Sequence, residues 1–232
     1  MIMDVKTLKE LQADMSERIN RKAKELGLVN DKCEPITDGV TDIDEYLKSS
    51  PRIMWVLKEP WDDIDENGIP CGGGWDMSEV FEKDDAWKNR TWQPIIYVSY
   101  GIVNRCYWKD MDWIRDDTCM ADVLKKIAYI NVSKMPGYTQ SDGEEIKQAY
   151  TNWRDILLEQ IKIYKPQIII FGYTFQLFKN DLIGIDAEPI YRDDGVIHVY
   201  EKDGMKLLDV YHPNQRIISR ELYIDSIIKQ CL

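Results

Sequence analysis

The chain has few of the residues that build metal sites or disulfide frameworks. Its 232 residues include five cysteines and only two histidines, His198 and His212. The cysteines are odd in number, widely spaced and without a Cys-x-x-Cys pair, which argues against a disulfide framework and against zinc or iron–sulfur centres. We therefore expect no metal and no cofactor, and the cysteine usage agrees with a cytosolic protein.

Long apolar runs and an excess of basic residues are also absent. No apolar run approaches the roughly 20 residues that span a bilayer, and residues 1–6 lack the apolar core of a signal peptide. We expect a cytoplasmic protein with no membrane partner. The net charge is −11, from 41 acidic and 30 basic residues. Because nucleic-acid-binding proteins usually carry a basic surface, binding to DNA would require a local basic patch.

The residues that are present predict an α/β fold. Helical periodicity recurs over residues 4–27, 141–164 and 217–232, with Ser141 and Glu144 as a capping box for the second of these helices. Apolar runs between them predict strands at residues 53–57, 127–130 and 166–171, and Asp203-Gly204 predicts a hairpin between residues 196–200 and 205–210. This alternation predicts a three-layer αβα sandwich with a largely parallel central sheet. Without a repeat or linker, residues 1–232 are expected to form one domain with an N-terminal packing helix.

Three of the predicted strands end in polar loops that contain proline. Glu59 precedes Pro60 after the first strand, Asn131 follows the second, and His212 follows the last. Because the carboxyl ends of parallel strands meet at one edge of a sheet, we expect these three side chains to converge where open α/β sheets bind ligands. A carboxylate, an amide and an imidazole can polarise water, read a planar heterocycle and stabilise developing negative charge.

The motifs, in this order, resemble those of the uracil-DNA glycosylase superfamily over residues 50–230. The shared features are an acidic residue before Pro60, Asn131 in an Asn-x-x-Lys run, Lys165-Pro166 before an apolar strand, and His212-Pro-Asn near the C-terminus. The resemblance implies a uracil-DNA glycosylase-like fold. It also implies a DNA glycosylase that hydrolyses the N-glycosidic bond of uracil or another damaged base, with DNA as a weak and salt-sensitive partner.

The resemblance also implies roles for individual residues. Glu59 would position or activate water and stabilise the cationic sugar, Asn131 would read the base, and His212 would support charge on the departing base. Two tryptophans would complete the base pocket, Trp61 as part of its floor and Trp75 as a ring that stacks on the base. The cations expected to contact phosphate are Lys58, Lys134, Arg216 and Arg220.

Two departures from the family pattern leave an alternative open. Lys58 stands where the family has an uncharged polar residue, so an ion pair with Glu59 would lower the basicity of that carboxylate. Cys71 stands where the family has the ring that stacks on the base. The alternative is a non-catalytic pocket protein of the same fold that binds a nucleobase, a nucleotide or a protein partner.

Each proposed role also has a purely structural interpretation. Glu59 fits a solvated strand end, Asn131 a turn former, and His212 a buried structural histidine. The two arginines also fit solvated helix charges. Four tryptophans fit either a surface for stacking bases or core packing, namely Trp87, Trp92, Trp108 and Trp113.

Overall fold

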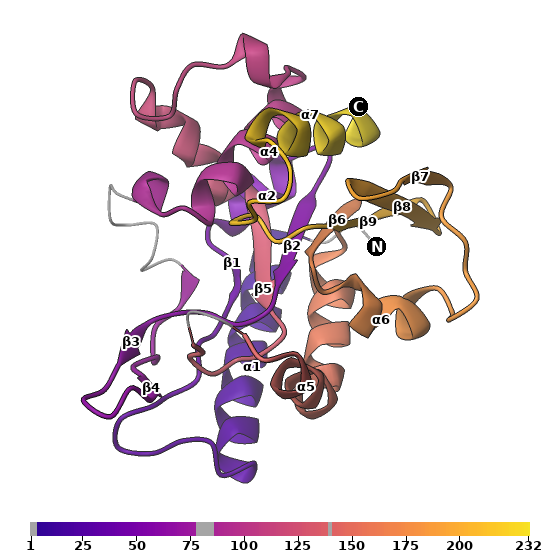
Figure 1. Ribbon diagram of the computed structural model, residues 1–232. Coiled ribbons are helices and arrows are strands. Elements are labelled where there is room, and N and C mark those ends of the chain that lie inside the picture. The colour runs from indigo at the N-terminus through magenta and orange to yellow at the C-terminus, as the bar shows by residue number, and fades with distance from the viewer. Residues whose placement is uncertain (1–3, 78–85, 139–140) are drawn as a thin grey trace.

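A seven-stranded mixed sheet forms the centre of the protein (Figure 1). The computed structural model describes residues 4–77, 86–138 and 141–232. In spatial order the strands are β1 (Gly39–Val40), β5 (Ile127–Asn131), β2 (Ile53–Leu57), β6 (Ile168–Gly172), β9 (Met205–Val210), β8 (Ile197–Lys202) and β7 (Tyr191–Asp193). A separate ribbon of β3 (Asp63–Ile64) and β4 (Pro70–Cys71) projects from the loop after β2.

The four central strands β5, β2, β6 and β9 are parallel, and β1, β8 and β7 are antiparallel to their neighbours. The predicted α/β class is therefore confirmed, and the parallel part of the sheet is its centre, to which antiparallel strands are added on both sides. The tight turn at Asp203-Gly204, where both residues have positive φ, returns the chain directly and forces β8 and β9 to be antiparallel.

Helices cover both faces of the sheet, giving three layers. One face carries α1 (Val5–Glu25), α2 (Ile43–Lys48), α5 (Gly143–Tyr164) and α6 (Phe175–Leu182), and the other carries α4 (Trp92–Asn104), α7 (Arg220–Cys231) and the 3₁₀ segment η3 (Thr118–Lys126). Figure 1 shows α4 and α7 above the sheet and α1 and α5 below it. Alternate residues of β2 face opposite layers, since Met54 packs with the first group and Trp55 with the second.

The remaining short helices, η1 (Ala86–Lys88) and η2 (Trp108–Asp110), lie beside α4 and α7. Trp92 and Trp108 pack against the core on this face, as the packing interpretation requires, whereas Trp113 is 54% exposed. In the described residues, no helix combines the length and the apolar character needed to cross a membrane.

The capping box predicted at Ser141 is wrong, and the difference bears on the site. The N-cap of α5 is Asp142, whose carboxylate accepts hydrogen bonds from the backbone N–H groups of Glu144 and Glu145 at 2.8 and 3.1 Å. Aspartate caps a helix at least as well as serine does, and the one-residue shift releases the Ser141 hydroxyl from that role.

Candidate functional site

The ends of the four parallel strands are aligned at one edge of the sheet. The register pairs Leu57 with Asn131 and Gly172 with Val210. Glu59 and His212 each follow the last residue of their strand by two positions, so both lie at the edge where Asn131 ends β5. The three residues therefore lie at the same edge of the sheet, as expected from the parallel strands.

Gly172 allows the loops after β2 and β9 to approach each other across the end of β6. A Cβ atom on Gly172 would lie 2.3 Å from Cδ2 of Leu57 and 3.0 Å from Cδ of Pro213. Any side chain there would push apart the segments that carry Glu59 and His212. The strand that separates these two residues thus ends in the one residue type that leaves room for both.

Asn131 is fully buried, and half of its amide group has no partner. Its Oδ1 accepts a hydrogen bond from the Tyr129 hydroxyl at 3.0 Å, which fixes the orientation of the amide. Its Nδ2 is buried and donates to no atom of the described residues. The group that Asn131 offers to a ligand is therefore a hydrogen-bond donor.

Glu59 carries the second buried polar atom without a partner, Oε1. Burial raises the pKa of this carboxyl, while a hydrogen bond from Ser141 and the positive charge of Lys58 act in the opposite direction. Gly137 makes room for the carboxylate, because a Cβ atom at that position would lie 2.2 Å from Cδ of Glu59. Buried polar atoms are nearly always hydrogen-bonded, so two unpaired ones at neighbouring strand ends indicate a place for a ligand or water.

His212 is held as a neutral imidazole. Burial and the nearby positive charge of Lys58 lower the pKa of His212 to about 4. Its Nδ1 accepts a hydrogen bond from the backbone N–H of Asn214 at 3.2 Å. The proton of the neutral ring is then on Nε2, which makes His212 a second hydrogen-bond donor at this edge.

Lys58 contacts an aromatic ring. Its Nζ lies 4.8 Å from the centroid of the Tyr173 ring, in a cation–π arrangement. Among the described residues, Lys58 forms no ion pair with Glu59, so the expected ion pair between them is not formed. The positive charge of Lys58 still lowers the pKa of Glu59, but this is the smallest of the effects on that pKa.

The prediction that Lys134 contacts phosphate is wrong. Its side chain is fully buried, and its Nζ donates to both carboxylate oxygens of Asp38 at 2.7 and 2.9 Å. The same ammonium donates to Oε1 of Gln160 and to the backbone carbonyl of Asn131, each at 2.8 Å. A lysine whose charge is neutralised in the core, with four short contacts, is not available to DNA.

The two predicted pocket tryptophans differ in exposure and in contacts. Trp61 is 57% exposed, so its ring does not form a buried floor. Trp75 donates through Nε1 to Oδ2 of Asp62 at 2.9 Å and packs against the core cluster to which α4 and α7 contribute. The same carboxylate oxygen accepts the backbone N–H of Gly73 at 2.6 Å, so the protein's own Asp62 occupies the glycine-rich turn where an anion would bind.

The remaining predicted contacts are at the surface. Arg216 and Arg220 are exposed, as both a phosphate contact and a solvated charge require. Within the described residues, no three His, Cys, Asp or Glu side chains gather to hold a metal ion.

Tyr173 is a candidate site residue that the sequence interpretation missed. It follows β6, is 63% exposed, and has φ of +65°, in the left-handed region that non-glycine residues rarely occupy. Its backbone N–H donates to the carbonyl of Val210 at 2.8 Å. A Gly-Tyr pair after an apolar strand is a weak signal, because the backbone conformation that turns the ring outward depends on the neighbouring β9.

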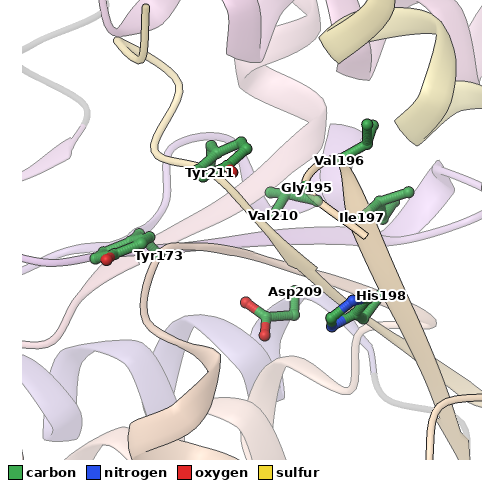
Figure 2. A pocket seen from close by; sticks show the side chains of 8 residues that line it. All are labelled: Tyr173, Gly195, Val196, Ile197, His198, Asp209, Val210 and Tyr211. Atoms are coloured by element: carbon green, nitrogen blue, oxygen red, sulfur yellow. The ribbon is translucent and has the colours of Figure 1, made fainter. Parts of the chain in front are cut away.

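A shallow cleft adjoins the site on the β8 side of β9 (Figure 2). Its volume of about 180 Å³ is below the roughly 300–1,000 Å³ of typical ligand pockets. The lining includes Tyr173, Tyr211, His198 and Asp209, but not Glu59, Asn131 or His212, which we expected to share one pocket. Figure 2 shows His198 and Asp209 on one side of the strand pair and Val196 and Tyr211 on the other.

No protein-family model matches the chain, and no curated protein matches it either. The chemical capacity of the site therefore has to be judged from its own atoms. It combines an amide donor at Asn131, a carboxylate oxygen at Glu59 and an imidazole donor at His212. Such a set matches a planar ligand with hydrogen-bond acceptors at its edge, beside a centre where positive charge develops.

Proposed function

We propose that the protein is a DNA glycosylase-like hydrolase with a uracil-DNA glycosylase-like fold. Its substrate would be uracil or another damaged base in DNA, and its reaction the hydrolysis of the N-glycosidic bond. The observation that carries the proposal is the pair of buried, unpartnered atoms, Nδ2 of Asn131 and Oε1 of Glu59, at neighbouring parallel strand ends. The ordered motifs of the sequence support it independently.

In this proposal Nδ2 of Asn131 donates a hydrogen bond to a carbonyl oxygen of the base. The orientation set by Tyr129 leaves only Nδ2 to meet the ligand, so a base edge with an acceptor is preferred. The target base must leave the base stack to reach a buried amide, as in other enzymes that act on bases.

Cleavage then transfers the electrons of the C–N bond to the base. Neutral His212 donates its Nε2–H to a base oxygen as negative charge accumulates there, without the competing charge of an imidazolium. The ionised Glu59 carboxylate stabilises the cationic sugar and orients a water molecule that adds to the sugar carbon. A proton from that water completes the released base or passes to solvent.

The alternative is a non-catalytic pocket protein of the same fold that binds a free nucleobase, a nucleotide or a protein partner. It is favoured by the burial of Lys134, which removes one expected phosphate contact. Acidic residues also follow Glu59 along the same loop, namely Asp62, Asp63, Asp65 and Glu66.

Single-turnover excision distinguishes the two. The substrates are labelled oligonucleotides that carry uracil, hypoxanthine, xanthine or a mismatched base. On the best of these, Glu59→Gln should lower the rate by at least about 10²–10⁴-fold, the usual worth of general-base assistance, while binding is retained. The control Glu201→Gln changes an exposed carboxylate of the β8–β9 hairpin and should leave the rate unchanged. Excision by Glu59→Gln at the parent rate would exclude the catalytic role of Glu59, and a parent inactive on every base would favour the binding protein.

A further inference from the structure

Each loop at the carboxyl edge of the four parallel strands exposes at least one large apolar side chain. The loop after β2 exposes Trp61 and Ile69, and the others expose Tyr138 after β5, Tyr173 after β6 and Ile217 after β9. A single exposed apolar residue is ordinary on a protein surface. Exposed apolar side chains on every loop at the edge that also holds two unpaired buried atoms favour a surface that contacts a ligand.

Tyr173 is the most constrained of these exposed residues. Because β6 lies between β2 and β9, Tyr173 lies between the loops that carry Glu59 and His212. Its N–H donates to the carbonyls of Val210 and Phe171 at 2.8 and 3.0 Å, which hold the left-handed backbone. Sparsely populated conformations of this kind concentrate at functional sites. The backbone thus turns the Tyr173 ring toward the surface. Most other tyrosines of the described residues are buried in, or packed against, one of the two core clusters.

The surroundings of Tyr173 suit a nucleotide. The Lys58 ammonium lies over the ring at 4.8 Å from its centroid and provides a positive charge for a phosphate. The Tyr173 residue is 63% exposed, and it also lines the cleft beside β9 together with Tyr211. An aromatic ring next to a cation is the combination with which proteins bind unpaired bases.

The charge of this edge favours a single strand over a duplex. Lys134 is buried in an ion pair, which leaves Lys58, Arg216 and Arg220 as the predicted phosphate contacts that remain accessible. Duplex binding depends on many phosphate contacts, whereas single strands are also bound by stacking of successive bases on aromatic rings.

We propose that Tyr173 and Lys58 form a stacking subsite for the nucleotide next to the target base in single-stranded DNA. The base stacks on the exposed part of the Tyr173 ring, and its phosphate meets the Lys58 ammonium. The subsite rests on the proposed function, since it deepens the description of the substrate of the same site.

The test compares Tyr173→Leu with Tyr173→Phe, which keeps the ring. The probes are a fluorescein-labelled single-stranded oligonucleotide with one uracil, the same strand in a duplex, and free deoxyuridine. Tyr173→Leu should weaken single-strand binding by about 5- to 150-fold, the range measured for one stacked base, and leave deoxyuridine binding unchanged. Tyr173→Phe should bind like the parent. The control Tyr191→Leu removes an exposed ring of β7, outside the residues that line the cleft, and should have no effect.

The subsite is overturned if Tyr173→Leu binds the single strand like the parent, or if Tyr173→Phe loses as much affinity as Tyr173→Leu. Melting temperatures of all variants show that each is folded. Excision rates separate this inference from the proposed function. Excision by the parent with no dependence on Tyr173 retains the hydrolase and rejects the subsite. Tyr173-dependent binding of the single strand without excision of any base rejects the hydrolase and retains the subsite.

Discussion

Two groups of buried polar residues meet at Asn131, and they differ in how completely they are hydrogen-bonded. The first is the core cluster of Asp38, Lys134 and Gln160, in which the ammonium, the carboxylate and the side-chain amide all have partners. The second is the edge pair of Glu59 and Asn131, in which Oε1 and Nδ2 have none among the described residues. Asn131 belongs to both, because its backbone N–H donates to Asp38 while Nδ2 of its side chain has no partner among the described residues.

The comparison shows that burial alone does not tell which polar residues keep hydrogen-bonding capacity for a ligand. Lys134 and Asn131 are both fully buried and only three positions apart. A buried polar atom without a partner destabilises a protein by roughly 1–3 kcal/mol, so it persists where another role maintains it. The core cluster stabilises the end of β5, and the edge pair leaves hydrogen-bonding capacity for a ligand.

The largest effect is expected in the core cluster. Lys134→Met leaves the Asp38 carboxylate buried without its counter-ion and should lower the free energy of unfolding by about 3–5 kcal/mol. Urea unfolding measures this. The control Lys147→Met breaks an exposed pair with Glu144 and should leave the free energy of unfolding unchanged. Unchanged stability together with weakened DNA binding would restore the phosphate role predicted for Lys134.

An intermediate effect is expected from His212 as the pH falls. The pKa of His212 is lowered from 6.5 to about 4 in the folded protein, so the unfolded chain binds a proton first as the pH drops through that range. The stability contributed by the neutral ring is complete above 6.5 and is lost toward 4, by about 2–3 kcal/mol. The variant His212→Asn keeps an acceptor for the Asn214 N–H. Between pH 6.5 and 4 its free energy of unfolding should fall by about 2–3 kcal/mol less than that of the parent. Parallel pH profiles of the two proteins would contradict a neutral, buried His212.

The sequence predicted the parts of the fold that depend on local pattern. The apolar run at residues 53–57 matches β2 residue for residue, because a buried parallel strand reads as continuous apolar residues. The positions of Glu59, Asn131 and His212 at one edge followed from strand order alone. The hairpin of β8 and β9 was predicted, but the outer strands β1 and β7 were missed because two and three residues are too few to produce a pattern.

What could not be predicted depends on residues far apart in the chain. Lys134 looked like a phosphate ligand because its partner Asp38 lies 96 positions earlier. Tyr173 was overlooked because its left-handed backbone is held by the carbonyl of Val210. In both cases the role of the residue depends on a contact with a distant part of the chain, which the local sequence does not predict.

The smallest effect, and the sharpest contrast with Lys134, is expected for the stability of Glu59→Gln. Removing the charge of Lys134 leaves an unpaired partner, whereas removing the charge of Glu59 relieves a carboxylate that is half-buried without a full set of partners. Burial raises the pKa of Glu59 in the folded protein, so its ionised form destabilises the fold above that pKa and not below the ordinary value of 4.5. Glu59→Gln should therefore be slightly more stable than the parent at neutral pH, and the gain should vanish as the pH falls toward 4.5. Urea unfolding of both proteins at several pH values measures the difference. A loss of stability at neutral pH would mean that Glu59 is held by contacts like those of Lys134, and the distinction between the two groups would fail.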